Sequence, residues 1–376
     1  MPPVTDRRTV VVFGSYAPSL ILFRKHLIAA LVSRGYKVVA MAPGISPEVE
    51  KAVRHLGAET HEVPMENNSL DPWATIRSYR ALVAILREVA PHAIIAYTIK
   101  PVTIGALAAS RAGVPKFVAM ITGLGFAFTE GGGLKRFLSR LVATTLYKSA
   151  LRRATAILFQ NDDDRRHFKA LNLLPGDRPV TIVNGSGIDL VEFAPTPLPD
   201  RPIFLMISRL LGDKGVREYG EAAIRLKREY PHVTFRLVGY FDQSPDALGQ
   251  DELDQMIAGG IEYIGKLEDV RPALAACSVY VLPSYREGTP RSVLEAMAMG
   301  RPIVTTDAPG CRETVEPGRN GFLVPPRQAG PLAQAMERFI IEPGLIGRMG
   351  AESRALAERK YEVTAVSRSI IEAAGL

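Results

Sequence analysis

The sequence predicts an α/β protein built from two doubly wound, Rossmann-like domains, each with a parallel sheet. The chain has 376 residues, which corresponds to roughly two or three domains of ordinary size. Hydrophobic residues make up 47% and charged residues 23%, as in a folded globular protein. Short apolar runs alternate with longer amphipathic stretches along the whole chain. That alternation is typical of parallel strands covered by helices on both faces.

Each half of the chain contains six apolar runs of strand length, separated by helical patterns. In the first half the predicted strands are Thr9–Phe13, Lys37–Met41, Ala93–Tyr97, Phe117–Ile121, Ala156–Gln160 and Val180–Val183. In the second half they are Ile203–Ile207, Thr234–Val238, Ile261–Ile264, Val279–Leu282, Pro302–Thr305 and Gly321–Val324. The first helical face is formed by Leu20, Leu27, Ile28 and Leu31.

Four prolines within Ala194–Pro202 predict the boundary between the domains, because proline at this density continues neither a helix nor a sheet. We expect a first domain over residues 1–193, a linker over 194–202 and a second domain over 203–359. A last helical pattern runs from about residue 351 to 374, and residues 360–376 are expected to pack on the first domain. Two such domains facing each other would place a ligand site in the cleft between them, beyond the carboxyl ends of the strands.

Charge is divided unevenly between the halves. Residues 1–190 carry 24 Lys and Arg against 14 Asp and Glu, whereas residues 191–376 carry 22 against 25. The basic half either meets an anionic partner, such as phospholipid, nucleic acid or a phosphorylated substrate, or reflects an accidental bias of solvated faces. No apolar run reaches the roughly 20 residues of a spanning helix. Two cysteines cannot form a disulfide framework, so we expect an intracellular protein.

Two glutamates lie around the predicted start of a helix near Pro290. Glu287 is in the loop after a strand, and Glu295 is in the helix eight residues later. Each carboxylate can accept two hydroxyl hydrogen bonds, as the diols of sugars offer. The helix N-terminus between them suits a phosphate. Two isolated glutamates would more often be a loop residue and a solvated helix residue, so a second motif is needed.

A basic loop provides that second motif. Arg209 and Lys214 follow the strand Ile203–Ile207, and a helix is predicted to begin near Val216. Arginine binds two phosphate oxygens at once, and lysine adds a mobile point charge. A strand, a short basic loop and a helix together indicate a diphosphate clamp.

At these residues the chain resembles the retaining glycosyltransferases of family 4, which have the GT-B fold. The family's E-x7-E motif matches Glu287 and Glu295, and its Arg/Lys pair matches Arg209 and Lys214. The resemblance covers almost the whole chain. Three segments are similar to one bacterial branch, which includes the N-acetylgalactosaminyltransferase acting on undecaprenyl-diphosphate-linked diacetylbacillosamine and related O-antigen and capsule enzymes. These segments are Tyr97–Pro101, Ile121–Thr129 and Asn184–Asp189.

The resemblance implies a role for each matching residue in binding the donor. Arg209 and Lys214 would hold the donor diphosphate and stabilise the departing nucleoside diphosphate, and Glu295 would hold the ribose diol. With Glu287, the two cations would form the catalytic group. The transferred sugar would be bound by Glu287, Gly288 and Thr289.

In the first domain, Gly14 would let the acceptor and the diphosphate approach the backbone closely. Arg24, Lys100 and Thr122 are expected to meet the acceptor. The chain departs from the family at one position. Many members have a histidine in this domain that touches the donor sugar, and residues 121–129 contain none. Thr122 or backbone groups would take over its role.

No metal and no cofactor are expected. Asp162, Asp163 and Asp164 contain an Asp-x-Asp pattern, but they follow a strand and open a helix, where acidic residues favour the N-terminus. The six histidines show no ligand spacing.

The stretch Leu134–Arg153 contains six Lys and Arg and no acid, together with apolar residues on one helical face. This pattern is typical of a helix lying in an anionic membrane interface. A core-facing helix with a basic outer side remains the alternative. The residues expected to meet the membrane are Lys135, Arg136, Phe137 and Arg140.

The predicted function is transfer of a sugar, an N-acetylhexosamine, from a UDP-sugar to an undecaprenyl-diphosphate-linked saccharide in bacterial glycan assembly. Anomeric configuration would be retained without a metal, by a peripheral enzyme on the cytoplasmic face of the inner membrane. The alternatives are a sugar-nucleotide epimerase of the same fold and a non-catalytic protein that binds anionic lipid. A nucleic-acid partner is not expected, because no basic strand carries interleaved aromatic residues.

Overall fold

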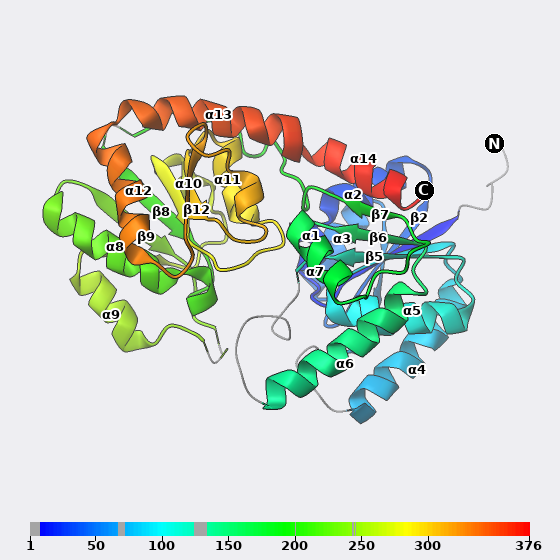
Figure 1. Cartoon of the computed structure of the whole chain (residues 1–376). Helices are drawn as coiled ribbons and strands as arrows, with labels where there is room; N and C mark the ends of the chain where they lie inside the picture. The colour runs from blue at the N-terminus through cyan, green and yellow to red at the C-terminus, as the bar shows by residue number, and fades with distance from the viewer. Residues whose placement is uncertain (1–7, 67–71, 124–133, 200, 243, 245) are drawn as a thin grey trace. The chain divides into compact units, whose positions relative to one another are not determined.

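The computed structural model of the chain divides into two compact units (Figure 1). The first unit comprises residues 1–186 and 364–376, and the second comprises residues 187–363. The structure describes the chain except for residues 1–7, 67–71, 124–133, 200, 243 and 245. For residues 72 and 134–140 it describes the backbone alone.

The first unit contains a seven-stranded parallel sheet in the order β3-β2-β1-β4-β5-β6-β7. The strands are β1 Thr9–Phe13, β2 Lys37–Ala42, β3 Glu59–Glu62, β4 Ala93–Tyr97, β5 Lys116–Ile121, β6 Ala156–Phe159 and β7 Val180–Ile182. The sequence did not predict β3. Its four residues, Glu-Thr-His-Glu, are polar and none is buried, because it is an edge strand with a single neighbour.

The second unit contains a six-stranded parallel sheet in the order β10-β9-β8-β11-β12-β13. The strands are β8 Ile203–Ile207, β9 Thr234–Val238, β10 Ile261–Gly265, β11 Val279–Leu282, β12 Ile303–Thr306 and β13 Gly321–Val324. These two sheets confirm the predicted pair of doubly wound domains.

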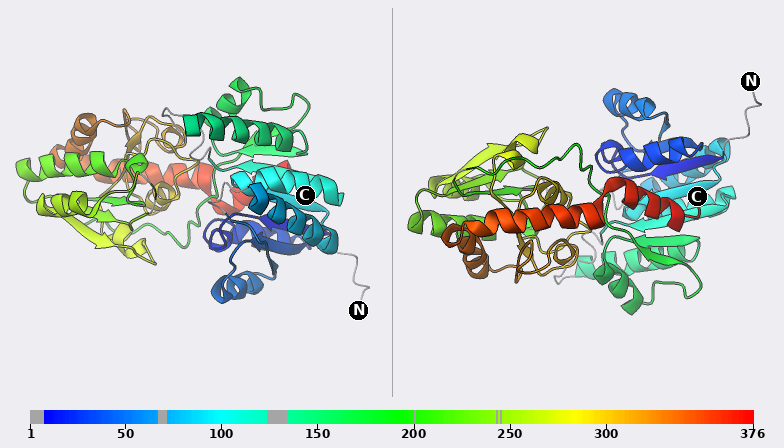
Figure 2. Two further views of the ribbon diagram at one scale, coloured as in Figure 1. Left: turned by 90° about the horizontal axis from the view of Figure 1, so that it is seen from below. Right: turned by 90° about the horizontal axis from the view of Figure 1, so that it is seen from above.

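Helices cover both faces of the sheet in the first unit (Figure 2). Its helices are α1 Ser19–Leu22, α2 Lys25–Ser33, α3 Pro47–His55, α4 Pro72–Val89, α5 Ile99–Ala112, α6 Leu134–Leu151, α7 Asp162–Ala170 and α14 Val363–Ala373. The second unit contains α8 Val216–Glu229, α9 Gln250–Ala258, α10 Arg271–Ala275, α11 Arg291–Ala298, α12 Ala329–Ile341, α13 Gly344–Tyr361 and the short helices η2 Gly212–Lys214 and η3 Arg312–Thr314. No described helix has both the length and the apolar composition needed to cross a membrane.

Alternation along the strands builds two apolar cores in the first unit. On β1, Val11 and Phe13 face the core under α4, α5 and α6, while Val10 and Val12 face the core under α1, α2, α3 and α14. The predicted last helix is two helices, because the chain is extended at Glu362. Of these, α14 contributes core residues to the first unit, among them Ile370 and Ile371.

The segment predicted as a linker, residues 194–202, falls inside the second unit, where the buried Arg301 binds it. Arg301 is 1% exposed and donates to the carbonyl of Thr196 at 2.9 Å and that of Pro197 at 3.3 Å. The same guanidinium also donates to the carbonyls of Leu274, Ala275 and Met299. A buried cation satisfied by carbonyl oxygens therefore attaches the proline-rich segment to α10 and α11.

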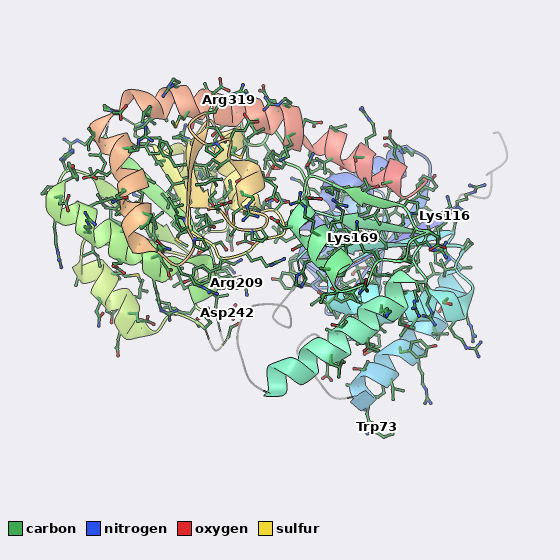
Figure 3. The ribbon with its side chains drawn as sticks, viewed as in Figure 1. Trp73, Lys116, Lys169, Arg209, Asp242 and Arg319 are labelled. Atoms are coloured by element: carbon green, nitrogen blue, oxygen red, sulfur yellow. The ribbon has the colours of Figure 1, made fainter. Side chains whose placement is uncertain are left out.

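Replacing Arg301 with alanine is expected to lower the free energy of unfolding by about 3 kcal/mol or more, because several buried carbonyls lose their donor at once. Urea unfolding followed by circular dichroism measures the change. The control is Arg319→Ala (Figure 3), an exposed residue with ion pairs to Glu316 and Glu352, which should change stability little. Equal losses in the two variants would contradict this role of Arg301.

Candidate active site

Each sheet has a point where the strand order reverses, between β1 and β4 in the first unit and between β8 and β11 in the second. Ligands of open α/β sheets bind outside the carboxyl ends of the strands at such a point. The loop that carries Arg209 and Lys214 follows β8, and the loop that carries Glu287 follows β11. The two predicted motifs therefore meet at the reversal point of the second sheet.

Backbone contacts join these two loops. The backbone N–H of Tyr285 donates to the carbonyl of Asp213 at 2.8 Å, and the Ser284 hydroxyl donates to the same carbonyl at 3.2 Å. Gly215 has a φ of +73°, and a Cβ placed there would lie 2.1 Å from the carbonyl oxygen of Pro283. Only glycine permits this approach, so the sequence at Gly215 fixes the spacing of the loops.

A short ion pair links the functional side chains of the two loops. Lys214 Nζ lies 2.6 Å from Glu287 Oε1, with exposed fractions of 16% and 17%. The Ser284 hydroxyl donates to the same carboxylate oxygen at 2.8 Å. Burial lowers the pKa of Lys214, but the Glu287 carboxylate more than offsets burial, so the pKa of Lys214 lies above its usual value. Lys214 is therefore a fixed positive charge.

Arg209 is held by a carboxylate that the sequence did not reveal. Its Nη1 donates to Asp242 Oδ2 at 2.8 Å, and Figure 3 labels both side chains. The Ser244 hydroxyl and Arg209 hold the pKa of Asp242 below its usual value. Asp242 belongs to no motif, but it follows β9, which lies beside β8 in the sheet. Strand order, once known, places Asp242 next to Arg209.

Glu295 occupies a separate position on α11. It is 8% exposed, and Arg291 Nε donates to its Oε1 at 2.8 Å, one helical turn away. Burial raises the pKa of Glu295, the Arg291 guanidinium opposes this rise, and two further acids, Glu192 and Asp269, add to it. Gly288 and Thr289 lie half-buried in the loop that leads into α11.

The expected acceptor residues follow neighbouring strands of the first unit. Gly14 follows β1, and a Cβ there would lie 2.3 Å from the Tyr97 hydroxyl, so this glycine makes room for a side chain of β4. Arg24 is 3% exposed; its guanidinium lies 4.6 Å from the centre of the Tyr97 ring and donates to the Ser186 hydroxyl at 3.1 Å. Arg24 is thus packed inside the first unit.

Lys100 lies in the first turn of α5 and donates to the carbonyl of Glu66. Burial lowers the pKa of Lys100. Thr122 directly follows β5 and is half-buried. The predicted membrane side chains fall outside the described residues, although the backbone there is part of α6; they are Lys135, Arg136, Phe137 and Arg140.

The Asp-x-Asp segment opens α7, as the sequence indicated. Asn161 Oδ1 caps the helix by accepting from the backbone N–H of Asp164 at 2.8 Å, and Asp162 forms ion pairs with Arg165 and Arg166. These contacts give Asp162 and Asp164 a structural role at the start of the helix. The absence of a metal requirement stays a prediction.

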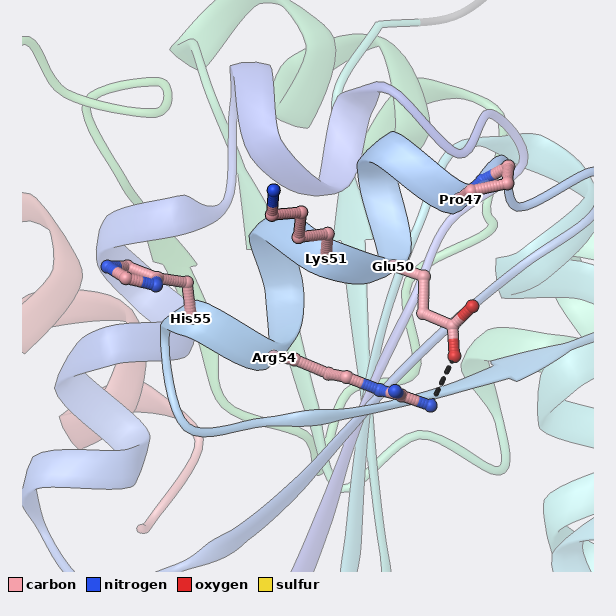
Figure 4. Close-up of a pocket in the computed structure, with 5 residues that line it drawn as sticks. All are labelled: Pro47, Glu50, Lys51, Arg54 and His55. Carbon is pink, nitrogen blue, oxygen red and sulfur yellow. Dashed lines mark hydrogen bonds and ion pairs between the residues drawn. The ribbon is translucent and has the colours of Figure 1, made fainter.

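A surface depression at α3 is lined mainly by charged side chains (Figure 4). Glu50 and Arg54 form an ion pair across one helical turn there. None of the predicted site residues lies in this depression, whose lining residues are Pro47, Glu50, Lys51, Arg54 and His55.

Comparison with known proteins identifies the family to which the chain belongs. Residues 23–185 match the glycosyl transferase 4-like domain, and residues 201–342 match the domain of glycosyl transferases group 1. The chain is 31% identical over 336 residues to the Campylobacter jejuni N,N'-diacetylbacillosaminyl-diphospho-undecaprenol α-1,3-N-acetylgalactosaminyltransferase, covering 86% of each protein. The chain belongs to this family of glycosyltransferases.

Two further proteins are similar to this glycosyltransferase, one in sequence and one in structure. The chain is 27% identical over 264 residues to the Escherichia coli UDP-Gal:α-D-GlcNAc-diphosphoundecaprenol α-1,3-galactosyltransferase, covering 66% of each chain. Its structure superposes on sucrose-phosphate synthase from Thermosynechococcus elongatus with a TM-score of 0.79 at 18% identity, covering 97% and 98% of the two chains. The GT-B fold predicted from the sequence is confirmed. Arg209, Lys214, Glu287 and Glu295 all lie in the domain that matches group 1.

In this glycosyltransferase, replacing Arg291 with alanine is expected to make stability depend more steeply on pH. Burial already raises the pKa of Glu295, and loss of the guanidinium raises it further. An acid whose pKa is higher in the folded than in the unfolded protein binds its proton more readily when folded. The free energy of unfolding therefore falls as the pH rises through the interval between the two pKa values.

Urea unfolding at a series of pH values from about 5 to 8 measures this slope. The control is Arg225→Ala, which removes an exposed pair with the same spacing, to Glu229, and should leave the slope unchanged. If the slope of Arg291→Ala equalled that of the unmodified protein, Arg291 would have no part in ionising Glu295.

Proposed function

We propose that this glycosyltransferase moves a sugar, an N-acetylhexosamine, from a UDP-sugar to a saccharide carried on a polyprenyl diphosphate. The observation that carries the proposal is the cluster of Arg209, Lys214 and Glu287 at the reversal point of the second sheet. The names of the two bacterial relatives support the substrates. Both include an undecaprenol-linked diphosphate, one an N-acetylgalactosaminyl group and the other UDP-Gal.

In this mechanism the donor diphosphate binds to Arg209 and Lys214. As the bond from the anomeric carbon to the diphosphate oxygen breaks, its electron pair moves to that oxygen and negative charge grows there. The two cations oppose this charge, and their carboxylate partners, Asp242 and Glu287, fix their positions beforehand. The acceptor hydroxyl attacks from the same face, so configuration is retained, and its proton passes to the departing diphosphate.

The other donor-site residues bind the ends of the nucleotide sugar. Glu295, which is buried on α11, accepts hydrogen bonds from the ribose hydroxyls. Glu287 and the backbone of Gly288 and Thr289 bind the transferred sugar at the N-terminal end of the same helix. A carboxylate at each end suits a ligand that carries a diol at both ends.

Replacing Arg209 or Lys214 with alanine is expected to reduce turnover by about 100-fold or more and to weaken donor binding less, because their charge matters most as the leaving group departs. Steady-state rates of UDP release, compared with donor affinity by calorimetry, separate the two effects. Arg236→Ala, which removes an ion pair to Glu262 elsewhere on the sheet, serves as the control. Lost affinity with intact turnover would refute the leaving-group argument.

Activity is expected to survive EDTA, because Arg209 and Lys214 supply the positive charge that a divalent ion supplies in other transferases. No cofactor is part of the proposal. The measurement is the transfer rate before and after chelation. Loss of activity that manganese or magnesium restores would instead indicate metal ligands, with Asp162 and Asp164 as the first to test.

The experiment that tests the function incubates the protein with a panel of UDP-sugars and an undecaprenyl-diphosphate-linked saccharide. UDP release that requires the acceptor, together with a lengthened glycan of retained configuration, is the expected result. Conversion of the UDP-sugar into its epimer without an acceptor would overturn the proposal in favour of an epimerase. The proposal includes a location at the cytoplasmic face of the inner membrane, on an anionic surface, and a lipid-linked acceptor supports it.

A further inference from the structure

Helix α4 presents an exposed face that combines the single tryptophan of the chain with a row of arginines. Trp73, in the first turn, is 71% exposed and Ile76 is 40% exposed. Arg77, Arg80 and Arg87 are exposed and follow at helical spacing on the same side. Exposed apolar side chains that adjoin one another and are rimmed by polar residues are typical of interaction sites.

The opposite side of α4 accounts for the folding of this helix. Leu82, Val83 and Leu86 are buried in the core of the first unit. Trp73 and Ile76 do not belong to that core and lie on the exposed side of the helix.

Helix α6 has a comparable exposed side in the same unit. Leu141 is 55% and Val142 is 58% exposed, whereas Tyr147 and Leu151 are buried. Lys148 is exposed one to two turns further along. On α4 the apolar side chains come first along the chain and the cations follow, whereas on α6 the exposed apolar pair lies between Lys135, Arg136 and Arg140 before it and Lys148 after it.

The two helices belong to one layer. Both pack against α5 on the same face of the sheet, and Figure 2 shows the three helices side by side in the view from below. Helices that connect parallel strands run opposite to them, so α4 and α6 begin at the carboxyl edge of the sheet. Glu88 is the single acid in the described parts of α4 and α6.

We propose that the α4–α6 face docks the enzyme on an anionic bilayer, with Trp73 at the level of the lipid headgroups. The α4–α6 face consists of Trp73, Ile76, Arg77, Arg80, Leu141, Val142 and Lys148. Tryptophan favours the membrane interface, where its ring is apolar and its N–H stays hydrated. The arginines and the lysine of this face are attracted electrostatically to acidic headgroups when they lie within a Debye length of the surface. Charge complementarity therefore selects anionic lipid as the partner.

This inference rests on the proposed function, since a lipid-linked acceptor brings the enzyme to a membrane. It adds a second contact to the basic helix α6 and identifies the residue that enters the interface. Because Trp73 precedes the arginines along α4, the helix meets the surface with its N-terminal end first, and the apolar tip lies deeper than the cations.

Intrinsic fluorescence tests the proposal directly, because the chain contains one tryptophan and its emission reports on position 73 alone. The full-length protein is mixed with vesicles of phosphatidylglycerol and phosphatidylcholine, or of phosphatidylcholine alone. We expect a blue shift, and quenching by lipids brominated near the headgroup, on the anionic vesicles, and reversal by high salt. No shift on anionic vesicles, or an equal shift on both kinds, would overturn the proposal.

A charge-reversal pair supplies the matched comparison. Arg77→Glu with Arg80→Glu should weaken vesicle binding at least tenfold. Arg225→Glu with Arg348→Glu, which changes the net charge equally on exposed helical positions of the second unit, should leave binding within about twofold. Equal losses in the two pairs would mean that net charge alone drives binding, and the α4–α6 face would then have no special role. Thermal unfolding of each variant checks that it is folded.

Activity assays separate this inference from the proposed function. The α4 variant should lose transfer to a long-chain lipid acceptor in vesicles and keep transfer to a short-chain, water-soluble one. A fluorescence shift in a protein that transfers to neither acceptor would leave docking intact and refute the function. Transfer to both acceptors without a shift would refute docking alone. A shift that appears on raising the protein concentration without vesicles would assign the face to a second copy of the chain.

Discussion

The ion pair between Lys214 and Glu287 is the contact on which the site in the second unit depends. These residues are 73 positions apart, on loops that follow different strands, and each charge holds the other in place across the two loops. The pair becomes possible because Gly215 lets the loops approach to backbone contact with Pro283. Burial alone would lower the pKa of Lys214, and the Glu287 carboxylate raises it. The carboxylate therefore both positions the ammonium group and keeps it protonated.

The same arrangement recurs around the pair. Arg209 has Asp242 as its partner, and Glu295 has Arg291. A site that must attract a diphosphate needs positive charge, and positive charges crowded into a partly buried place repel each other and unfold the loops that carry them. Acids interleaved with the cations relieve this repulsion. The cations keep a defined geometry, and little reorganisation is needed when an anion arrives.

Much of the fold and of the site could be predicted from the sequence, because both depend on local patterns. The twelve predicted strands are present with ends within one residue, since buried parallel strands are apolar along their length. β3 was missed because a polar edge strand has no such pattern. Asp242 could not be predicted because it belongs to no motif. It lies near Arg209 because β9 is next to β8 in the sheet. The ion pair between Arg291 and Glu295 could have been predicted from its i, i+4 spacing on a helix. The attachment of the proline-rich segment could not be read from its own residues, because it depends on Arg301, about a hundred residues away.

The path of the chain through the two units bears on how the protein is made. The first unit is interrupted after residue 186 and completed by residues 364–376, whose Ile370 and Ile371 cover one face of its sheet. During synthesis, all of the second unit leaves the ribosome before this cover does, so it can fold first as a continuous segment. Until then the first unit exposes part of an apolar core. A truncation that removes α14 would therefore damage the unit that is translated first, and the second unit would survive it.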